Sequence, residues 1–315
     1  MNASVTASFG PIGWLGELAE PTPGAEVGGK AASLDQLARL GFRIPPGFCV
    51  TTAAFAAHVA AIAELGPLRE ALAALPDEEA RVTVVGLVSE SPVPPSVGDA
   101  LRRALVRLTA DGERSLAVRS SAIGEDGATA SYAGLHDTEL GLAADEVEPA
   151  VRRCWSSLWS SAALGYRLAR SLPIDDAAMA VVVQTLVPAD AAAVVFTRHP
   201  VTGRDDQLVI NAVRGLGEPM VSGAATPDTY VVDKRSHEVQ GFEPGDAGER
   251  LFAIDGRVTR NADPARGPAL DTAVLRELVA LALQVERAFG AAVDVEAAYA
   301  RGRWYLLQAR PITTR

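Results

Sequence analysis

The chain is poor in cysteine and in basic residues. It has 2 cysteines among 315 residues, and Lys+Arg 29 against Asp+Glu 39 gives a formal net charge of −10. Two cysteines supply neither a disulfide scaffold nor a zinc framework, which favours a reducing, cytoplasmic setting. The acidic balance argues against a general nucleic-acid binder, so we expect no nucleic-acid partner.

Long apolar runs and an early positive charge are also missing. The most apolar stretches, 177–183 and 191–196, are far shorter than the roughly 20 residues that a membrane-spanning helix needs. The first basic residue is Lys30, so the positive start of a signal peptide is lacking. We therefore expect a cytoplasmic protein with no membrane contact. A content of 48% hydrophobic and 22% charged residues excludes wholesale disorder, and 315 residues suit two lobes.

The pattern of apolar residues predicts an α+β fold whose character changes near residue 178. A helix-rich N-terminal lobe, 1–177, is expected to precede a C-terminal lobe of β-branched strands, 178–315. Helices are expected at 30–40, 52–110 with breaks at its glycine and prolines, 145–172 and 271–289. Strands are expected at 48–51, 115–119, 178–187, 192–196, 207–212, 229–233, 293–300 and 304–309.

Two basic residues follow patterns that suit phosphate binding. Lys30 follows two glycines at the start of a helix, where a ligand can approach the backbone closely and the helix N-terminus favours anions. Arg119 ends a strand and precedes a Ser- and Gly-rich loop, from which it can hold phosphate oxygens. Two alternatives stay open: a solvated lysine, and an arginine paired with Glu125 or Asp126.

Four polar residues near the C-terminus suit a metal and phosphate site. Asp294 and Glu296 share one face of a strand, and Gln308 and Arg310 share one face of the next. Carboxylate and amide oxygens are ligands that Mg²⁺ prefers when it bridges nucleotide phosphates, and an arginine can bind phosphate bidentately. The alternative is the ordinary solvent face of a hairpin, although the aliphatic residues around these charges make unpaired charges costly.

The histidines and a further glycine-rich segment give weaker signals. His199 lies in a loop between two strands and has no second histidine with which to form a metal pair. His58 and His237 are expected at the surface, and His136 is expected in a strand near the phosphate loop. The glycine-rich segment 215–218 is typical of a plain turn.

Taken together, these segments resemble the N-terminal ATP-binding domain of the phosphoenolpyruvate synthase, pyruvate phosphate dikinase and rifampin phosphotransferase family. Each segment is weak alone, whereas their order along nearly the whole chain is specific. The matching segments are GGKAASL at 28–34, IPPGF at 44–48, VRSSA at 118–122, SYAG at 131–134, VQ at 183–184, FT at 196–197, PVTG at 200–203, GLGE at 215–218, DVE at 294–296 and LQARPIT at 307–313.

The resemblance implies an ATP-grasp-like fold of two lobes with ATP between them. Lys30 and Arg119 would hold ATP phosphates, and Arg310 would support them, with Arg119 and Arg310 as the catalytic arginines. Glu296 and Gln308 would bind Mg²⁺. The remaining expected nucleotide contacts are Gly134, whose loop covers the phosphates, Thr138, and Gln184 near the adenine.

The implied activity is transfer of the β-phosphoryl group of ATP to a histidine on a separate swivelling domain or protein, giving AMP and phosphate. That histidine would pass the group to a small molecule such as pyruvate, a rifamycin-type antibiotic or a pathway metabolite. The sequence departs from this pattern because it contains no such histidine domain, and Ala162 stands where an arginine is expected. Two alternatives are a stand-alone ATP-grasp kinase or ligase that acts directly on a small molecule, and a non-catalytic nucleotide-binding module.

The metal assignment makes a geometric prediction about the last hairpin. If Glu296 and Gln308 bind one Mg²⁺, they must face each other across the two strands, and Asp294 must then face Arg310. The same register pairs Ala300 with Trp304 and leaves a three-residue turn, 301–303. A two-residue turn, 301–302, would instead pair Glu296 with Leu307, move Gln308 to the opposite face and so break the metal site.

Overall fold

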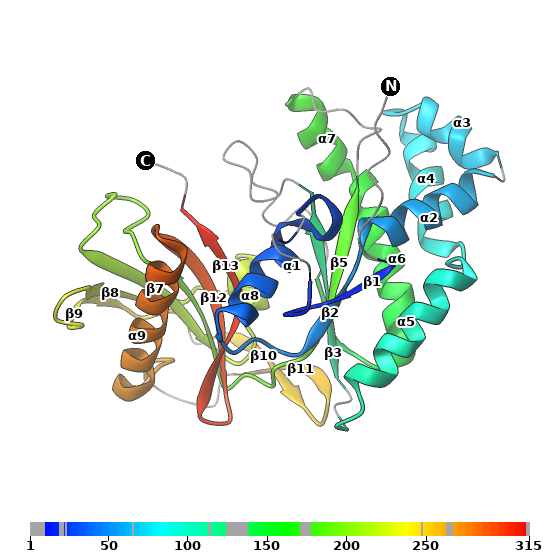
Figure 1. Cartoon of the computed structure of the whole chain (residues 1–315). Helices are drawn as coiled ribbons and strands as arrows, with labels where there is room; N and C mark the ends of the chain where they lie inside the picture. Colours follow the sequence, from blue (N-terminus) through cyan, green and yellow to red (C-terminus); the bar gives the residue numbers. More distant parts are fainter. Residues whose placement is uncertain are drawn as a thin grey trace. The chain divides into compact units, whose positions relative to one another are not determined.

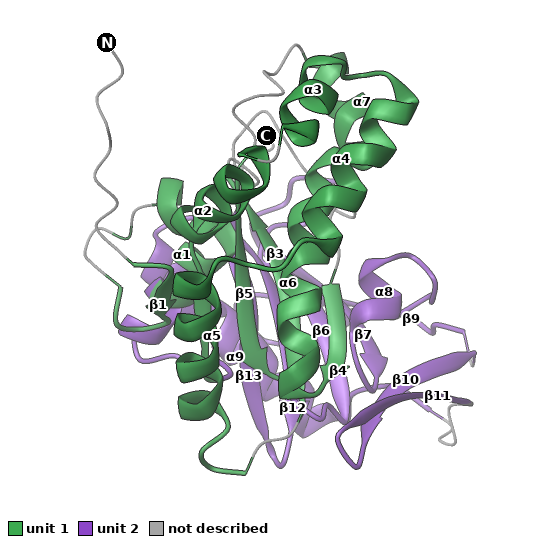
Figure 2. Ribbon diagram, turned by 90° about the vertical axis from the view of Figure 1, so that its right-hand side faces the viewer, with its two compact units in different colours: residues 1–35, 46–185 green, residues 36–45, 186–315 purple. Residues whose placement is uncertain are grey.

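The computed structural model of the chain describes residues 10–18, 22, 24–64, 66–112, 115–123, 138–170, 178–246, 248–262 and 267–312. The chain forms two compact units, shown in separate colours in Figure 2. Unit 1 comprises residues 1–35 and 46–185, and unit 2 comprises 36–45 and 186–315. The strand at the expected lobe boundary, β5 (Met179–Thr185), pairs with earlier strands inside unit 1, so the change of unit follows Thr185.

Unit 1 is built on a five-stranded antiparallel sheet in the order β1-β2-β5-β3-β4. Besides β5, its strands are β1 (Ile12–Trp14), β2 (Gly47–Val50), β3 (Leu116–Ala122) and β4 (Thr138–Leu142). Its helices are α1 (Gly24–Arg39, whose last residues belong to unit 2), α2 (Thr52–Ala63), α3 (Pro67–Ala73), α4 (Glu78–Glu90), α5 (Pro95–Leu108), η1 (Ala144–Glu146), α6 (Val147–Ser156), η2 (Ser157–Trp159) and α7 (Ser161–Ala169).

The two faces of the unit 1 sheet differ in chemistry because side chains alternate along each strand. On one face, residues such as Phe48, Val118 and Val181 are buried in the core with the apolar sides of α2, α4, α5 and α6. The other face carries the alternate residues of β2, β3 and β5, and the backbone of α1 reaches it through Val27, whose carbonyl accepts from Cys49 and Ser121. The aliphatic face thus anchors the helices, while the other face is left for polar groups.

Unit 2 is built on a six-stranded antiparallel sheet in the order β13-β12-β6-β7-β8-β9. Its strands are β6 (Ala191–Phe196), β7 (Gln207–Arg214), β8 (Asp228–Asp233), β9 (Val239–Glu243), β12 (Val293–Ala300) and β13 (Arg303–Pro311). Helix α9 (Thr272–Phe289) buries its Leu and Val stripe against one face of this sheet (Figure 1). Residues 36–45 join this core through Leu37 and through the carbonyl of Arg43, which accepts from the Leu306 amide at 2.8 Å.

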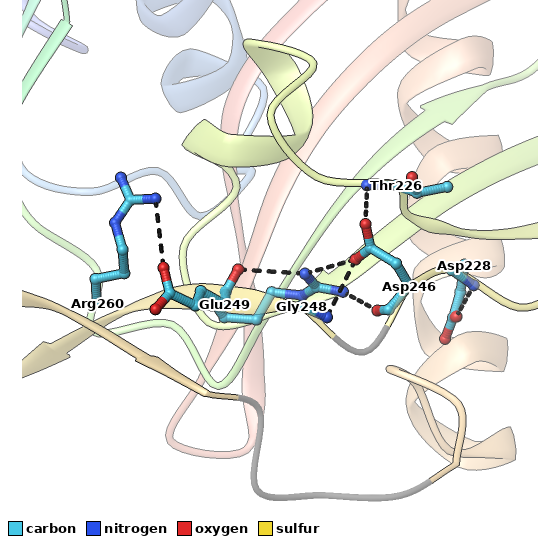
Figure 3. A network of polar contacts seen from close by, with 8 residues as sticks. Thr226, Asp228, Asp246, Gly248, Glu249 and Arg260 are labelled. Carbon is cyan, nitrogen blue, oxygen red and sulfur yellow. Dashed lines mark hydrogen bonds and ion pairs between the residues drawn. The ribbon is translucent and has the colours of Figure 1, made fainter.

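A short helix and a two-stranded hairpin complete unit 2. They are α8 (Glu218–Val221) and the antiparallel pair β10 (Glu249–Ile254) and β11 (Arg257–Ala262). Figure 3 shows the polar network at the start of β10, in which the Asp246 carboxylate accepts from the amides of Thr226 and Gly248. The guanidinium of Arg250, 4% exposed, donates to the same carboxylate at 3.0 Å. This network ties β10 to the segment before β8.

Most expected elements are present with shifted ends. The expected helix 30–40 already begins at Gly24. The expected helical region 145–172 is a continuous run of η1, α6 and η2 followed by the separate helix α7, with Leu168 exposed rather than inward. Ser160 divides η2 from α7 because its side chain accepts from the Ala163 amide and so begins a new helix. The strands predicted from the sequence did not include β1, β4, β9, β10 or β11. None of the helices in the described ranges combines the length and apolar character needed to cross a membrane.

Candidate functional site

Three of the residues expected to contact ATP share the polar face of the unit 1 sheet. Arg119 in β3 faces Thr138 in β4 and Val182 in β5. Facing residues of an antiparallel pair point to the same side, so Arg119 and Thr138 are neighbours on one face. Gln184 lies two residues beyond Val182 in β5 and therefore points to that face as well. Gln184 is 1% exposed, whereas Arg119 is half-buried and Thr138 is exposed.

Lys30 lies against the same strand, β3. Its side chain is 7% exposed, and its ammonium donates to the carbonyl oxygen of Ser120 at 2.8 Å. The interpretation of Lys30 as a solvated surface residue is therefore wrong. The structure brings Lys30 and Arg119 to one strand although 89 positions separate them in the sequence. Long-range packing of α1 on β3 produces this arrangement.

Two sequence-based expectations near this region have different outcomes. Gly134, like the whole segment 124–137 with His136, Glu125 and Asp126, lies outside the described residues. Ala162, at the position where an arginine was expected, lies exposed in the first turn of α7.

In unit 2, the last hairpin brings together all four of its polar candidates. Glu296 faces Gln308, and Asp294 faces Arg310, across β12 and β13. The predicted register is thus confirmed for these pairs. Val293, Val295 and Ala309 alternate with them and are buried against α9 on the other face, which leaves the four polar groups together on the face away from that helix.

The turn of this hairpin differs from the prediction. Ala300 pairs with Arg303 rather than with Trp304, so the turn has two residues, and both have positive φ: 53° at Arg301 and 73° at Gly302. Such angles are typical of the tight turn that matches strand twist. A β-bulge at Leu307 then inserts one extra residue between the turn and Gln308. The extra residue returns Gln308 to the face of Glu296, so the short turn does not separate the pair.

Two of the charged residues on this face, Asp294 and Arg310, form a partly buried ion pair. The Arg310 guanidinium donates to one carboxylate oxygen of Asp294 from Nε at 2.9 Å and lies 2.8 Å from it through Nη2. The side chain of Asp294 is 11% exposed and that of Arg310 is 35% exposed. Gln308 is buried and Glu296 is half-buried. The ion pair compensates the cost of burying Asp294 and holds Arg310 beside the Glu296–Gln308 pair.

The hairpin is chemically suited to a hard cation that also binds phosphates. No group of three or more His, Cys, Asp or Glu side chains in the described part of the chain is placed to hold a metal. Glu296 and Gln308 nevertheless offer one carboxylate and one amide oxygen on facing positions. Mg²⁺ is commonly bound by one or two side chains plus substrate phosphates and water, so this pair fits such an ion without a protein cage.

Among the described residues, the other titratable candidates do not form a site. His58 is fully buried, so the expectation of a surface position is wrong; one ring nitrogen lies 2.9 Å from the carbonyl of Val88. His199 Nδ1 accepts from the amides of Val201 and Thr202 and so holds its own loop. Cys49 and Cys154 are buried and form no disulfide, and burial raises the pKa of the Cys49 thiol, which makes it a poor nucleophile.

Comparison with known proteins identifies the family. The sequence profile of the family described as pyruvate phosphate dikinase, AMP/ATP-binding domain, matches residues 24–315. The chain belongs to this family. The match covers both units, including Lys30 and Arg119 in the first and the polar hairpin in the second.

Three curated relatives are similar over most of the chain. A probable phosphoenolpyruvate synthase of Methanocaldococcus jannaschii is 36% identical over 96% of this chain and 27% of its own length. The prodigiosin synthesizing transferase PigC of Serratia marcescens is 40% identical over 91% of this chain and 32% of its own. A rifampicin phosphotransferase of a Streptomyces species is 39% identical over 92% of this chain and 34% of its own. The chain thus spans about a third of these relatives.

Among solved structures, D-alanyl-alanine synthetase A of Vibrio cholerae aligns with a TM-score of 0.34 and 11% identity, over 90% of this chain and 58% of that one. This superposition is too loose to carry an argument about the site. The α+β class follows from the structure itself, in which helices cover two antiparallel sheets. Family membership shows that the chain carries an AMP/ATP-binding domain of this family.

Proposed function

We propose that this chain is the ATP-binding part, with an ATP-grasp-like fold, of a cytoplasmic phosphotransferase that moves the β-phosphoryl group of ATP to a histidine on a separate domain or protein. The observation that carries the proposal is the facing of Glu296 and Gln308 beside the Asp294–Arg310 pair. The names of the relatives support it, since one is a probable phosphoenolpyruvate synthase and another a rifampicin phosphotransferase.

In this proposal basic side chains bind the phosphates of Mg-ATP. Lys30, Arg119 and Arg310 neutralise phosphate charge through charge-assisted hydrogen bonds. Thr138, Gln184 and Gly134 are further nucleotide contacts, and Glu296 and Gln308 hold the metal. Bound Mg²⁺ would draw charge from the transferring phosphoryl group and fix its orientation.

In the proposed transfer, the bond between the β-phosphorus and the oxygen that bridges it to the α-phosphate breaks, and its electron pair leaves with AMP. A neutral imidazole nitrogen of the partner histidine forms the new bond to the β-phosphorus, while water takes the γ-phosphoryl group as inorganic phosphate. Arg119 and Arg310 stabilise the charge that develops on the phosphate oxygens. The phosphohistidine then delivers its phosphoryl group to a small-molecule acceptor, of which pyruvate and a rifamycin-type antibiotic are examples.

Binding measurements test the nucleotide site. Loss of one charge-assisted contact is expected to weaken Mg-ATP binding about tenfold or more, which calorimetry on Lys30→Ala and Glu296→Ala would detect. Glu243→Ala is a matched control, because Glu243 occupies the same row and face of the unit 2 sheet as Glu296 but in the edge strand β9. Unchanged affinity in both site variants would remove the nucleotide assignment.

Product analysis tests the reaction. The chain, Mg-ATP and a cognate histidine domain are expected to yield AMP and an acid-labile phosphoprotein, with little turnover when that domain is omitted. Formation of ADP and a phosphorylated small molecule by the chain alone would establish a direct kinase instead. Tight Mg-ATP binding with no product in either mixture would favour a non-catalytic nucleotide-binding module.

A further inference from the structure

Helix α1 is interrupted just before its lysine. Gly28 has φ 74° and ψ 167°, which are not helical angles, so α1 consists of two helices that meet at this kink, and the second of them carries Lys30. A restarted helix leaves its first amide groups without acceptors from the preceding turn. The short stretch that carries Lys30 therefore needs an acceptor from elsewhere in the fold.

The hydroxyl of Ser121 supplies that acceptor from strand β3. Its oxygen accepts from the Ala31 amide at 3.1 Å, and the hydroxyl donates to the Val27 carbonyl at 2.9 Å. The hydroxyl thus bridges the two sides of the Gly28 bend, and it does so from 90 residues away in the sequence. Ser121 is fully buried, so water does not compete for these hydrogen bonds.

The close approach of Gly28 to Ser121 leaves no space for a side chain at residue 28. A Cβ atom at residue 28 would lie 2.0 Å from the carbonyl oxygen of Ser121 and 2.4 Å from its hydroxyl oxygen. Only glycine combines this close approach with a positive φ. The backbone contact between Gly28 and Ser121 therefore fixes where the lysine-bearing part of α1 begins.

The other end of the Lys30 side chain is held by the neighbouring residue of the same strand. The Lys30 ammonium donates to the carbonyl oxygen of Ser120 at 2.8 Å, and Arg119 precedes that residue. Ser121 therefore fixes the backbone from which Lys30 projects, Ser120 receives its ammonium, and Arg119 is the second cation on the strand.

We propose that Ser121 is a positioning residue for Lys30: its hydroxyl caps the restarted helix and so places the lysine ammonium beside β3, next to Arg119, for phosphate binding. This inference rests on the proposed function, because it assigns Lys30 to the phosphates of ATP. Ser121 carries no charge, so in this inference it affects ATP affinity only through the position of Lys30.

A double-mutant cycle measured by Mg-ATP affinity tests the inference. Ser121→Ala is expected to weaken Mg-ATP binding about fivefold, the loss typical of a removed helix cap. In a Lys30→Met background the same change is expected to have less than about a twofold effect, because the residue that it positions is gone. A serine that only stabilised the fold would cause the same loss in both backgrounds.

Ser120→Ala is the matched control. Ser120 is the adjacent residue, is equally inaccessible at 2% exposed, and meets Lys30 through a backbone carbonyl that alanine retains. It is expected to change the affinity less than about twofold. Ser121→Cys keeps a weaker donor and acceptor, so it should give an intermediate affinity and can replace Ser121→Ala in the cycle if that variant does not fold.

Two outcomes separate the inference from the function on which it rests. Equal losses in both backgrounds, or no loss from Ser121→Ala, would overturn the positioning role while Lys30→Met still weakened binding. Unchanged affinity in Lys30→Met itself would overturn the phosphate assignment of Lys30, and the positioning role with it.

Discussion

The two charged regions of this chain are built in opposite ways. In unit 2, Glu296 and Gln308 lie in one hairpin and face each other through local strand pairing. In unit 1, Lys30 reaches β3 only because a helix from early in the chain packs on a strand about 90 residues later. The first region depends on register, and the second on long-range packing.

The difference shows which kind of change each region tolerates. A hairpin site is sensitive to the number of residues between its two strands, since a shift of one residue reverses the faces. Leu307 is one extra residue in β13, and the bulge that it forms compensates for the two-residue turn, so that Gln308 still faces Glu296. The contact between α1 and β3 is sensitive to side-chain volume instead, because two backbones meet there with no space for a Cβ atom.

The largest expected effect comes from a methyl group at the α1–β3 contact. Gly28→Ala is expected to lower the free energy of unfolding by at least about 3 kcal/mol, because it adds a severe clash to the strain of a positive φ. Gly112→Ala is the control, since Gly112 has φ +84° with open space around its Cβ position. It should cost only about 1–2 kcal/mol. Denaturant unfolding measures both, and equal losses would mean that the contact is not tight.

A second effect concerns His58, which also depends on long-range contacts in unit 1. Burial lowers the pKa of His58 below its ordinary 6.5, and the charge of Arg152 on α6 adds to this, while the Val88 carbonyl and Glu148 oppose it. A group with a lowered basic pKa is neutral in the folded protein, so protonation favours the unfolded chain. The free energy of unfolding should not be reduced by His58 above about pH 6.5 and should decrease as the pH falls below that value. The loss is up to about 1.4 kcal/mol for each unit by which the pKa of His58 in the folded protein lies below that in the unfolded chain.

His58→Gln removes the titrating group while keeping an amide that can donate to the Val88 carbonyl. Urea unfolding between pH 7.5 and pH 5 should show a smaller decline in this variant than in the original chain. Parallel declines in the two proteins would assign the acid sensitivity to other groups.

The smallest effect is expected at the hairpin turn and should be stabilising. Arg301 has φ 53°, a conformation that a long side chain adopts at a cost and that asparagine tolerates well. Arg301→Asn should raise the free energy of unfolding by about 0.5–1 kcal/mol. Arg303→Asn, the same change two residues on in extended β13, should give no gain because asparagine is disfavoured in strands. A gain of similar size at both positions would mean that the turn conformation is not its cause.

The sequence predicts much of this arrangement because local patterns carry it. The alternation of residues 293–300 and the period of 271–289 identify the strand and the helix, and the facing of Glu296 and Gln308 follows from an assumed metal. Strands β10 and β11 have a half-exposed, mixed composition without clear alternation, so no local signal identified them. The assignment of β5 to unit 1 depends on its pairing with β2 and β3, and the sequence of β5 alone does not predict which strands it pairs with.

The sequence by itself determined the family, the residue types available for Mg-ATP and the pairs expected to face each other, because these follow from ordered motifs and from strand periodicity. Tertiary structure alone decided that Leu307 bulges, that Lys30 is buried against Ser120, and that the Ser121 hydroxyl begins the helix that carries it. The physical reason is the separation along the sequence between the interacting residues. Periodicity acts over a few residues, whereas these contacts join backbone groups whose partners are defined only when distant segments pack together.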